Sequence, residues 1–141
     1  MVKDIVKDPI FLSRKCKTAN AKEDEQWMAD LLDTALHYKE TKNCVGLACN
    51  QIGGDKRLIV VWNGHTFFGL MNPVIVKKSK LTHMSEEGCL SLEGIRTVKR
   101  YNWVTVVSVD PTTGKAMTNT FRGQTANIVQ HEIDHLNGKL I

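Results

Sequence analysis

Apolar and polar residues alternate with different periods along the chain, and each period predicts a different element. In residues 21–38 the apolar side chains recur at helical spacing, so this segment is expected to be an amphipathic helix with one face on the core. Asn20 precedes the segment and Glu23 follows three residues later, an arrangement like a capping box that predicts the helix start. The apolar face consists of Trp27, Met28, Leu31, Leu32, Ala35 and Leu36.

Runs rich in β-branched and aromatic residues follow and predict strands. They cover residues 57–62, 66–71, 74–76, 98–103, 104–109 and 116–122. Asn63-Gly64 is typical of a hairpin turn. Residues 125–136 return to helical spacing before Asn137-Gly138, a pair that commonly ends a helix. The pattern predicts an α+β fold class with mostly antiparallel β-sheets, an N-terminal amphipathic helix and a second helix near the C-terminus.

Length and composition narrow the class of protein. The chain has 141 residues, 42% of them hydrophobic and 24% charged, which is close to one ordinary domain and excludes a disordered tail. No repeat or linker interrupts it, so residues 1–141 are expected to form a single domain. The sequence shows no membrane-spanning run and no secretory signal, so we expect a cytoplasmic location without membrane partners.

Charge and cysteine content exclude two further classes. The net charge of +4 is spread along the chain rather than gathered on one stripe, so no specific nucleic-acid partner is expected. Four cysteines lie far apart without a CxxC pair, and without a secretory signal they are expected to be core residues, metal ligands or nucleophiles rather than disulfides.

The predicted late helix contains the sequence His131-Glu132-Ile133-Asp134-His135. Two histidines four residues apart lie on one helix face, so both imidazoles can reach one metal ion. Glu132 lies beside them and can act on a water molecule at the metal without being a ligand. The alternative reading is a solvated helix that happens to carry histidines and carboxylates.

A catalytic metal needs a third protein ligand. Residues 136–141 contain no His, Cys, Asp or Glu, so this ligand must come from upstream of the helix. Cys89 is the best candidate because a thiolate suits a borderline-soft cation such as Zn²⁺ or Fe²⁺. One cysteine by itself is weak evidence, and a merely structural role for it stays open at this point.

Three segments together make a specific resemblance. Residues 45–51 (VGLACNQ), 87–91 (EGCLS) and 130–135 (QHEIDH) resemble the three ordered motifs of the peptide deformylases. The resemblance covers nearly the whole chain. It implies one catalytic domain over residues 1–141, with antiparallel sheets around a central HExxH helix. It also implies an enzyme that removes the formyl group from the N-terminal formyl-methionine of newly made polypeptides.

The resemblance assigns the metal chemistry residue by residue. It makes Cys89, His131 and His135 the ligands of one metal ion per chain, naturally Fe²⁺, with Ni²⁺, Co²⁺ or Zn²⁺ as substitutes. A hydroxide on that metal would attack the formyl carbon, with Glu132 as general base and then general acid.

The resemblance also assigns the groups that meet the substrate. The side chain of Gln51 and the backbone N–H of Leu90 would stabilise the oxyanion. The formylated peptide would lie as an added strand against Val45 and Gly46, with Arg96 near it. Glu87 resembles one half of a structural ion pair with Arg100 and is grouped with the substrate-binding residues. The face of the HExxH helix that should line the methionine pocket carries Gln124, Asn127 and Ile128.

The chain departs from the family pattern at several positions. Cys44 and Cys49 stand where Gly and Ala are usual, and Glu93 replaces a frequent Pro. The amides of Gln124 and Asn127 make the predicted pocket more polar than usual. The sequence ends six residues after His135, where many family members continue into a helix that aids ribosome docking. We therefore expect no docking by that route and at most a transient ribosome contact.

Two other functions remain open from the sequence. The chain could be a paralogue that acts on a different N-acyl peptide, as the altered pocket residues suggest. It could also be a non-catalytic binding module stabilised by a metal, although such a module would not need Glu132. A metalloprotease is disfavoured because no ligand lies downstream of the helix.

Overall fold

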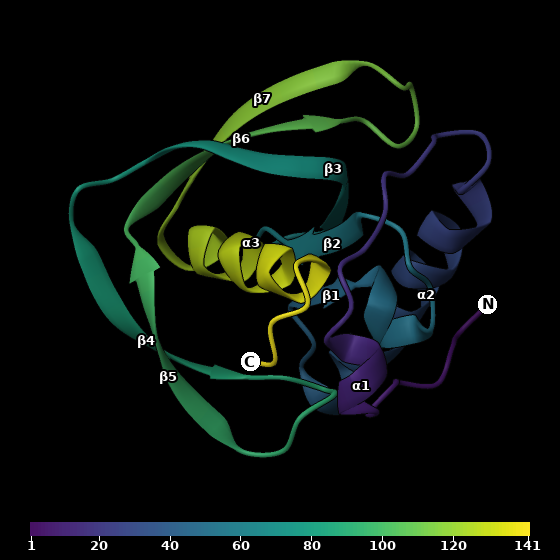
Figure 1. Ribbon diagram of the computed structural model, residues 1–141, viewed down its shortest axis with the longest axis horizontal. Helices are drawn as coiled ribbons and strands as arrows, with labels where there is room; N and C mark the ends of the chain where they lie inside the picture. Colours follow the sequence, from purple (N-terminus) through teal and green to yellow (C-terminus); the bar gives the residue numbers. More distant parts are fainter.

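The computed structural model describes residues 1–141 and confirms the α+β fold class, with antiparallel sheets arranged around a late helix (Figure 1). The helices are α1 (Pro9–Leu12), α2 (Glu25–Lys42), the 3-10 helix η1 (Cys49–Ile52) and α3 (Gly123–Leu136). The strands are β1 (Gly46–Ala48), β2 (Leu58–Trp62), β3 (Phe67–Lys78), β4 (Thr82–Gly88), β5 (Ile95–Tyr101), β6 (Trp103–Val109) and β7 (Ala116–Arg122). None of the helices is both long enough and apolar enough to cross a lipid bilayer.

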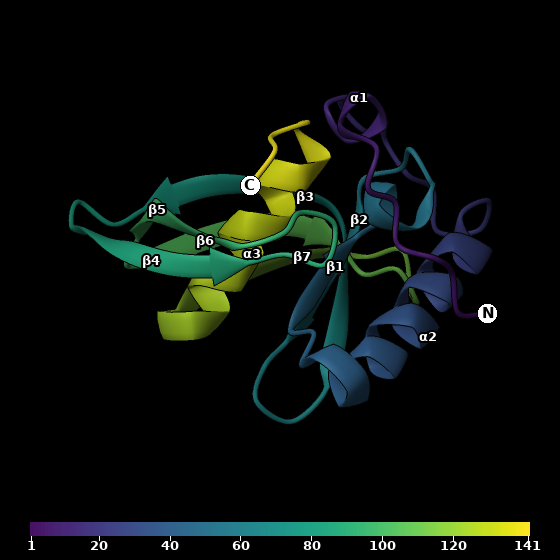
Figure 2. The same cartoon turned by 90° about the horizontal axis from the view of Figure 1, so that it is seen from below.

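Two separate antiparallel sheets flank α3. The larger one has the strand order β1-β2-β3-β6-β7, and β4 and β5 form a two-stranded ribbon of their own. In Figure 1, α3 lies between the strands β3, β6 and β7 above it and the β4–β5 ribbon below it, and Figure 2 shows the ribbon crossing the helix. The helix is thereby enclosed, and side chains on its different faces meet different strands.

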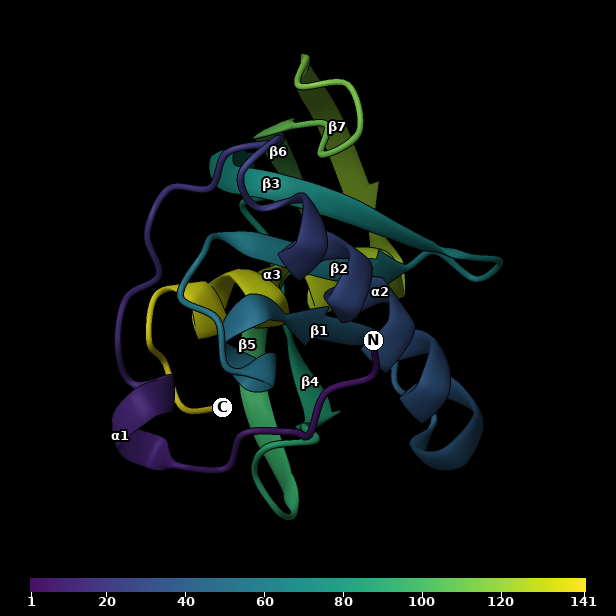
Figure 3. The same ribbon diagram turned by 90° about the vertical axis from the view of Figure 1, so that its right-hand side faces the viewer.

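Strand β2 is buried on both faces, which explains its uninterrupted apolar sequence. Successive side chains of a strand point to opposite faces. Ile59 and Val61 therefore pack in the core cluster that contains α3, whereas Leu58 and Val60 pack in the cluster that contains α2. Figure 3 shows the same arrangement, with α2 in front of the sheet and α3 behind it.

The N-terminal amphipathic helix exists, but its predicted limits are wrong. It begins at Glu25 and ends at Lys42, and Asp24 is its N-cap residue. Asn20 caps a separate turn instead, since its Oδ1 accepts hydrogen bonds from the backbone N–H groups of residues 22 and 23. Leu36 was expected on the core face, yet 53% of it is exposed. Met28, Leu31 and Ala35 of the predicted face are buried, together with Asp30 and Thr34.

The predicted strands are present with altered limits. Residues 66–71 and 74–76 join in the single strand β3, which tolerates an irregularity at Asn72, where φ is +52°. The run 98–103 is divided at Asn102, so that Trp103 starts β6 rather than ending β5. Strand β4 is missing from the predicted set, because its sequence is mostly polar and it alternates between exposed and half-buried side chains. This strand carries His83 and Glu87, both of which matter for the site.

Candidate active site

A cavity of about 670 Å³ opens between α3, the end of β4 and the start of β1. The structure brings most of the sequence-predicted site residues to its wall. These are Val45, Gly46, Gln51, Glu87, Cys89, Leu90, Gln124, Asn127, Ile128, His131 and Glu132. Arg96 is not among the lining residues; it lies on β5 as the cross-strand partner of Glu87. His135 lies deeper, and its side chain is fully buried.

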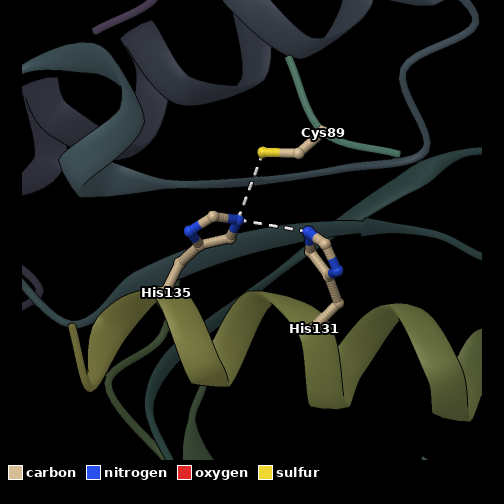
Figure 4. Close-up of side chains that lie close together, drawn as sticks. All are labelled: Cys89, His131 and His135. Atoms are coloured by element: carbon tan, nitrogen blue, oxygen red, sulfur yellow. Dashed lines mark hydrogen bonds between the residues drawn. The ribbon is translucent and has the colours of Figure 1, made fainter. Parts of the chain in front are cut away.

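Three side chains that were predicted as metal ligands converge beside this cavity (Figure 4). The Sγ atom of Cys89 lies 3.4 Å from Nε2 of His135. The Nε2 atoms of His135 and His131 lie 3.1 Å apart. The two histidines project from successive turns of α3, whereas the cysteine approaches from the loop after β4.

The donor set fits a single transition-metal ion. The ligand atoms of Cys89, His131 and His135 all lie within 4.8 Å of one another. Around a tetrahedral ion with metal–nitrogen distances of about 2.0 Å and a metal–sulfur distance of about 2.3 Å, such donors are roughly 3.3 to 3.6 Å apart. The two imidazoles and the thiolate therefore need only small shifts to share an ion, and three protein ligands leave a coordination position open, as catalytic sites require.

A network of charged side chains contacts His131 at Nδ1. Its Nδ1 atom lies 2.8 Å from Oε1 of Glu87. The Arg100 guanidinium donates two hydrogen bonds to the Glu87 carboxylate, of 2.6 and 2.9 Å, and a third of 2.6 Å to Asp134. Burial by itself raises the pKa of Glu87, but the hydrogen bonds from Arg100 and His131 outweigh it and lower that pKa to about 2. Glu87 therefore stays a carboxylate and orients the imidazole.

The imidazoles differ in their affinity for protons. Burial lowers the pKa of His131, but the neighbouring Cys89 and Glu87 more than compensate and raise it to about 10. Burial, together with the positive charges of His131 and Arg100, lowers the pKa of His135 to about 3. The surroundings of His131 thus favour a positive charge, and a bound cation would take the place of the proton.

Glu132 is held as a buried carboxyl group next to the ligands. It is 4% exposed, and its Oε1 atom has no hydrogen-bond partner in the chain. Burial raises the pKa of this carboxyl group to about 7. Gly46 makes room for it, because a Cβ atom at that position would come within 2.7 Å of Glu132 Oε2 and 2.6 Å of Ile128 Cγ2. An unpaired buried carboxylate with a neutral-range pKa is suited to proton transfer.

Gln51 approaches the metal-ligand cluster from η1. Its Oε1 accepts a hydrogen bond of 3.0 Å from the backbone N–H of Ala48, which fixes the amide plane. Its Nε2 donates towards Oγ of Ser91 at 3.2 Å and towards Sγ of Cys89 at 3.4 Å. The backbone N–H of Leu90, next to Cys89, has no partner in the chain. Two N–H donors of different origin therefore lie beside the cysteine.

Sequence reasoning missed some residues that shape the site. Asp134 was passed over although it lies within the HExxH segment, and it binds Arg100. His83 was not considered, because nothing in the sequence marks β4 as a neighbour of α3. Its Nε2 lies 2.9 Å from Oδ1 of Asn127, a cavity residue. Ser91 is buried and holds Gln51.

Comparison with known proteins places this architecture in a family. Residues 2–141 match the family model described as polypeptide deformylase. The chain is 44% identical over 141 residues to a peptide deformylase of Clostridium beijerinckii, with full coverage of both chains. It is 40% identical to a peptide deformylase of Symbiobacterium thermophilum, over 97% of this chain and 64% of that protein.

Solved structures show the same fold. An actinonin-bound class I type b peptide deformylase from Acinetobacter baumannii superposes with a TM-score of 0.87 at 32% identity, covering 99% of this chain and 95% of that chain. A deformylase from the Vibrio parahaemolyticus bacteriophage VP16T, also in complex with actinonin, gives a TM-score of 0.84 at 34% identity, covering 98% and 99%. The chain therefore belongs to the peptide deformylase family, enzymes that hydrolyse the N-formyl group from newly made polypeptides.

Proposed function

We propose that this chain is an Fe²⁺-dependent deformylase of N-formyl-methionyl peptides, with Cys89, His131 and His135 as the ligands of one metal ion. One observation carries the proposal. A cysteine sulfur and two imidazoles converge beside a cavity, next to a buried carboxyl group, Glu132, that is not part of the ligand set. A purely structural metal site has no use for such a carboxylate, whereas hydrolysis needs a group that accepts and returns a proton.

The ion, when bound, polarises the formyl oxygen and makes water a nucleophile at neutral pH. Zn²⁺, Ni²⁺ and Co²⁺ suit the same donors and are expected to substitute for Fe²⁺. The protein supplies the proton transfers. Glu132 Oε1, which has no partner in the chain, accepts the proton of the attacking water and later returns it to the leaving amine.

Two N–H donors are assigned to the oxyanion that develops on the formyl group. The Leu90 backbone N–H has no partner in the chain and therefore has none to give up when substrate binds. The Gln51 amide is held in place by Ala48 and Ser91, and its Nε2, which lies 3.4 Å from the Cys89 sulfur, is assigned to the substrate oxygen. Donors fixed before the reaction stabilise the developing charge without reorganisation.

The peptide backbone is expected to bind along Val45 and Gly46. β1 is the edge strand of the larger sheet, so one side of its backbone is free to pair with an added strand. The Gly46 carbonyl receives only a weak hydrogen bond of 3.3 Å from the Cys44 thiol, which a peptide N–H displaces readily. Binding through main-chain groups tolerates many sequences after the first residue, as a processing enzyme requires. Arg96 is assigned to later residues of the peptide.

The reaction is assigned to the cytoplasm, where polypeptides begin with formyl-methionine. The test is an anaerobic assay of the Fe²⁺-loaded protein on formyl-Met-Ala-Ser, with acetyl-Met-Ala-Ser as the matched control. We expect turnover of the formyl peptide alone. Preferred hydrolysis of the acetyl peptide would identify a paralogue with another N-acyl substrate, and binding without turnover of either peptide would identify a non-catalytic module.

A further inference from the structure

The cavity wall contains two amide side chains from α3, Gln124 and Asn127, and only one of them is anchored. Oδ1 of Asn127 lies 2.9 Å from Nε2 of His83, on β4. The side chain of Gln124 has no hydrogen-bond partner in the chain, and the residue is exposed. His83 therefore ties one cavity residue of the HExxH helix to the β4–β5 ribbon that crosses it (Figure 2).

His83 is itself held by a contact on the other side of its ring. The second ring nitrogen of His83, Nδ1, lies 2.6 Å from Oδ1 of Asn102, which separates β5 from β6. The backbone N–H of Asn102 donates to Oγ of the buried Ser79 at 2.8 Å. His83 is thus bound on both sides of its ring, and Asn127 is ordered before any substrate arrives. A side chain ordered in advance loses little further entropy when a ligand binds.

A neutral imidazole donates from only one of its nitrogens, and we assign the ring proton of His83 to Nε2. Oδ1 of Asn127 then accepts from Nε2–H, and the NH₂ group of Asn127, which carries two donors, has no partner in the chain. Asn127 lines the same cavity as Cys89 and His131. A substrate side chain that enters the cavity therefore meets an oriented N–H donor.

We propose that Asn127, positioned by His83, donates a hydrogen bond to the substrate's first side chain and makes the pocket favour a side chain with an acceptor over a hydrocarbon of the same shape. The inference rests on the proposed function, because it takes this cavity as the pocket for that side chain. The thioether of methionine is a weak acceptor, and the oxygen of methionine sulfoxide is a strong one. Norleucine, in which a methylene replaces the sulfur, offers none.

The experiment compares kcat/KM for formyl-methionine-sulfoxide-Ala-Ser and formyl-norleucyl-Ala-Ser. The decisive quantity is the ratio of the two values, because losses of general activity cancel in it. In Asn127→Leu we expect the sulfoxide-to-norleucine ratio to fall about fivefold, the worth of one neutral hydrogen bond. Asn127→Asp, which keeps the shape but removes the donor, should lower it at least as much. Asn119→Leu, a control at an exposed amide on β7 outside this cavity, should leave it unchanged.

His83 is tested as a positioning residue by the same ratio. His83→Phe should lower the ratio, and adding this change to Asn127→Leu should lower it no further, because both act through one group. His83→Gln, which keeps an N–H donor, should recover part of the loss. A structural role alone would lower both kcat/KM values together and leave the ratio constant. Folding and metal content are measured for every variant.

Calorimetric measurement of product-peptide binding distinguishes a failure of the Asn127 proposal from a failure of the proposed function. If the wild-type protein hydrolyses no formyl peptide, the proposed function fails, while the ratio of dissociation constants for Met-sulfoxide-Ala-Ser and norleucyl-Ala-Ser still tests the pocket. An unchanged ratio in folded, metal-loaded Asn127→Leu would overturn the proposal. A raised ratio would overturn it as well, because it would mean that the amide presents its oxygen to the pocket.

Discussion

Nδ1 of His131 lies 2.8 Å from Oε1 of Glu87, and this contact links the HExxH helix to the β4–β5 ribbon. The carboxylate is kept charged by Arg100 and fixes the imidazole with Nε2 towards Cys89 and His135. Partners of this kind orient a ligand and raise its basicity. Glu87, which was grouped with the substrate-binding residues and expected to pair with Arg100, thus contacts His131, a proposed metal ligand.

Glu87→Gln is predicted to weaken metal binding by about 10- to 100-fold, the usual effect of removing such a partner. The amide keeps the shape but no longer offers a charged acceptor to the imidazole. Competition with a chelator for Co²⁺ measures the change. Glu86→Gln is the matched control, since the neighbouring Glu86 has an exposed side chain and makes no contact with the histidines. Equal affinities for wild type and Glu87→Gln would contradict the assigned role.

Cys89→Ser should lose most of its metal affinity, because a neutral hydroxyl replaces the only sulfur ligand. X-ray absorption of the wild-type protein should show one sulfur and two nitrogen donors per ion. Cys16→Ser is the control, since Cys16 lies in the core cluster and should leave the metal content unchanged. An absorption spectrum without sulfur scattering would remove Cys89 from the ligand set.

Glu132→Ala is predicted to keep its metal and its fold while turnover of a formyl-Met peptide falls by at least ~10²-fold, the lower range for a general acid–base group. The reason is that Glu132 contributes to the transition state without binding the ion. Metal analysis and steady-state kinetics on the same preparation check this. Stoichiometric loss of the metal in this variant would show that Glu132 is a ligand after all.

Gly46→Ala should impair catalysis more than it impairs stability. The added methyl group would lie within 2.7 Å of a Glu132 carboxylate oxygen, so the carboxylate or Ile128 must move. Overpacking of this kind costs about 1–3 kcal/mol in the free energy of unfolding. We expect kcat to fall by at least about tenfold while urea unfolding stays cooperative. A variant with wild-type kcat would show that Glu132 does not need its present position.

The stability of the protein should decrease at alkaline pH through Cys49. Burial raises the pKa of this thiol from 9.0 to about 12 in the folded state. The stability that the neutral Cys49 thiol contributes is therefore complete below pH 9. It is lost as the pH rises from about 9 towards 12, because in this range the thiol ionises readily only in the unfolded state. Between pH 8 and 10 the wild type should lose on the order of 1 kcal/mol more than Cys49→Ala in chelator-containing urea titrations. The same pH dependence of the unfolding free energy in wild type and Cys49→Ala would contradict this prediction.

Features that depend on local spacing can be predicted from the sequence alone. Two histidines four residues apart share a helix face in any α-helix, so the pair His131 and His135 could be recognised before the fold was known. The run 57–62, rich in β-branched and aromatic residues, likewise predicted a strand, and β2 (Leu58–Trp62) forms there. The resemblance then supplied Cys89, which spacing alone left as a weak candidate.

Only the tertiary structure decided which distant groups meet. Asn20 has the features of an N-cap, yet it caps a separate turn and Asp24 is the N-cap residue of the helix. The contact between His83 and Asn127 joins residues 44 positions apart, and the polar sequence of β4 carries no sign of it. Periodicity reports which face of an element is buried, but it carries no information about the partner that covers that face. The contact partner of Asn127 is set by the tertiary packing, in which the β4–β5 ribbon crosses α3.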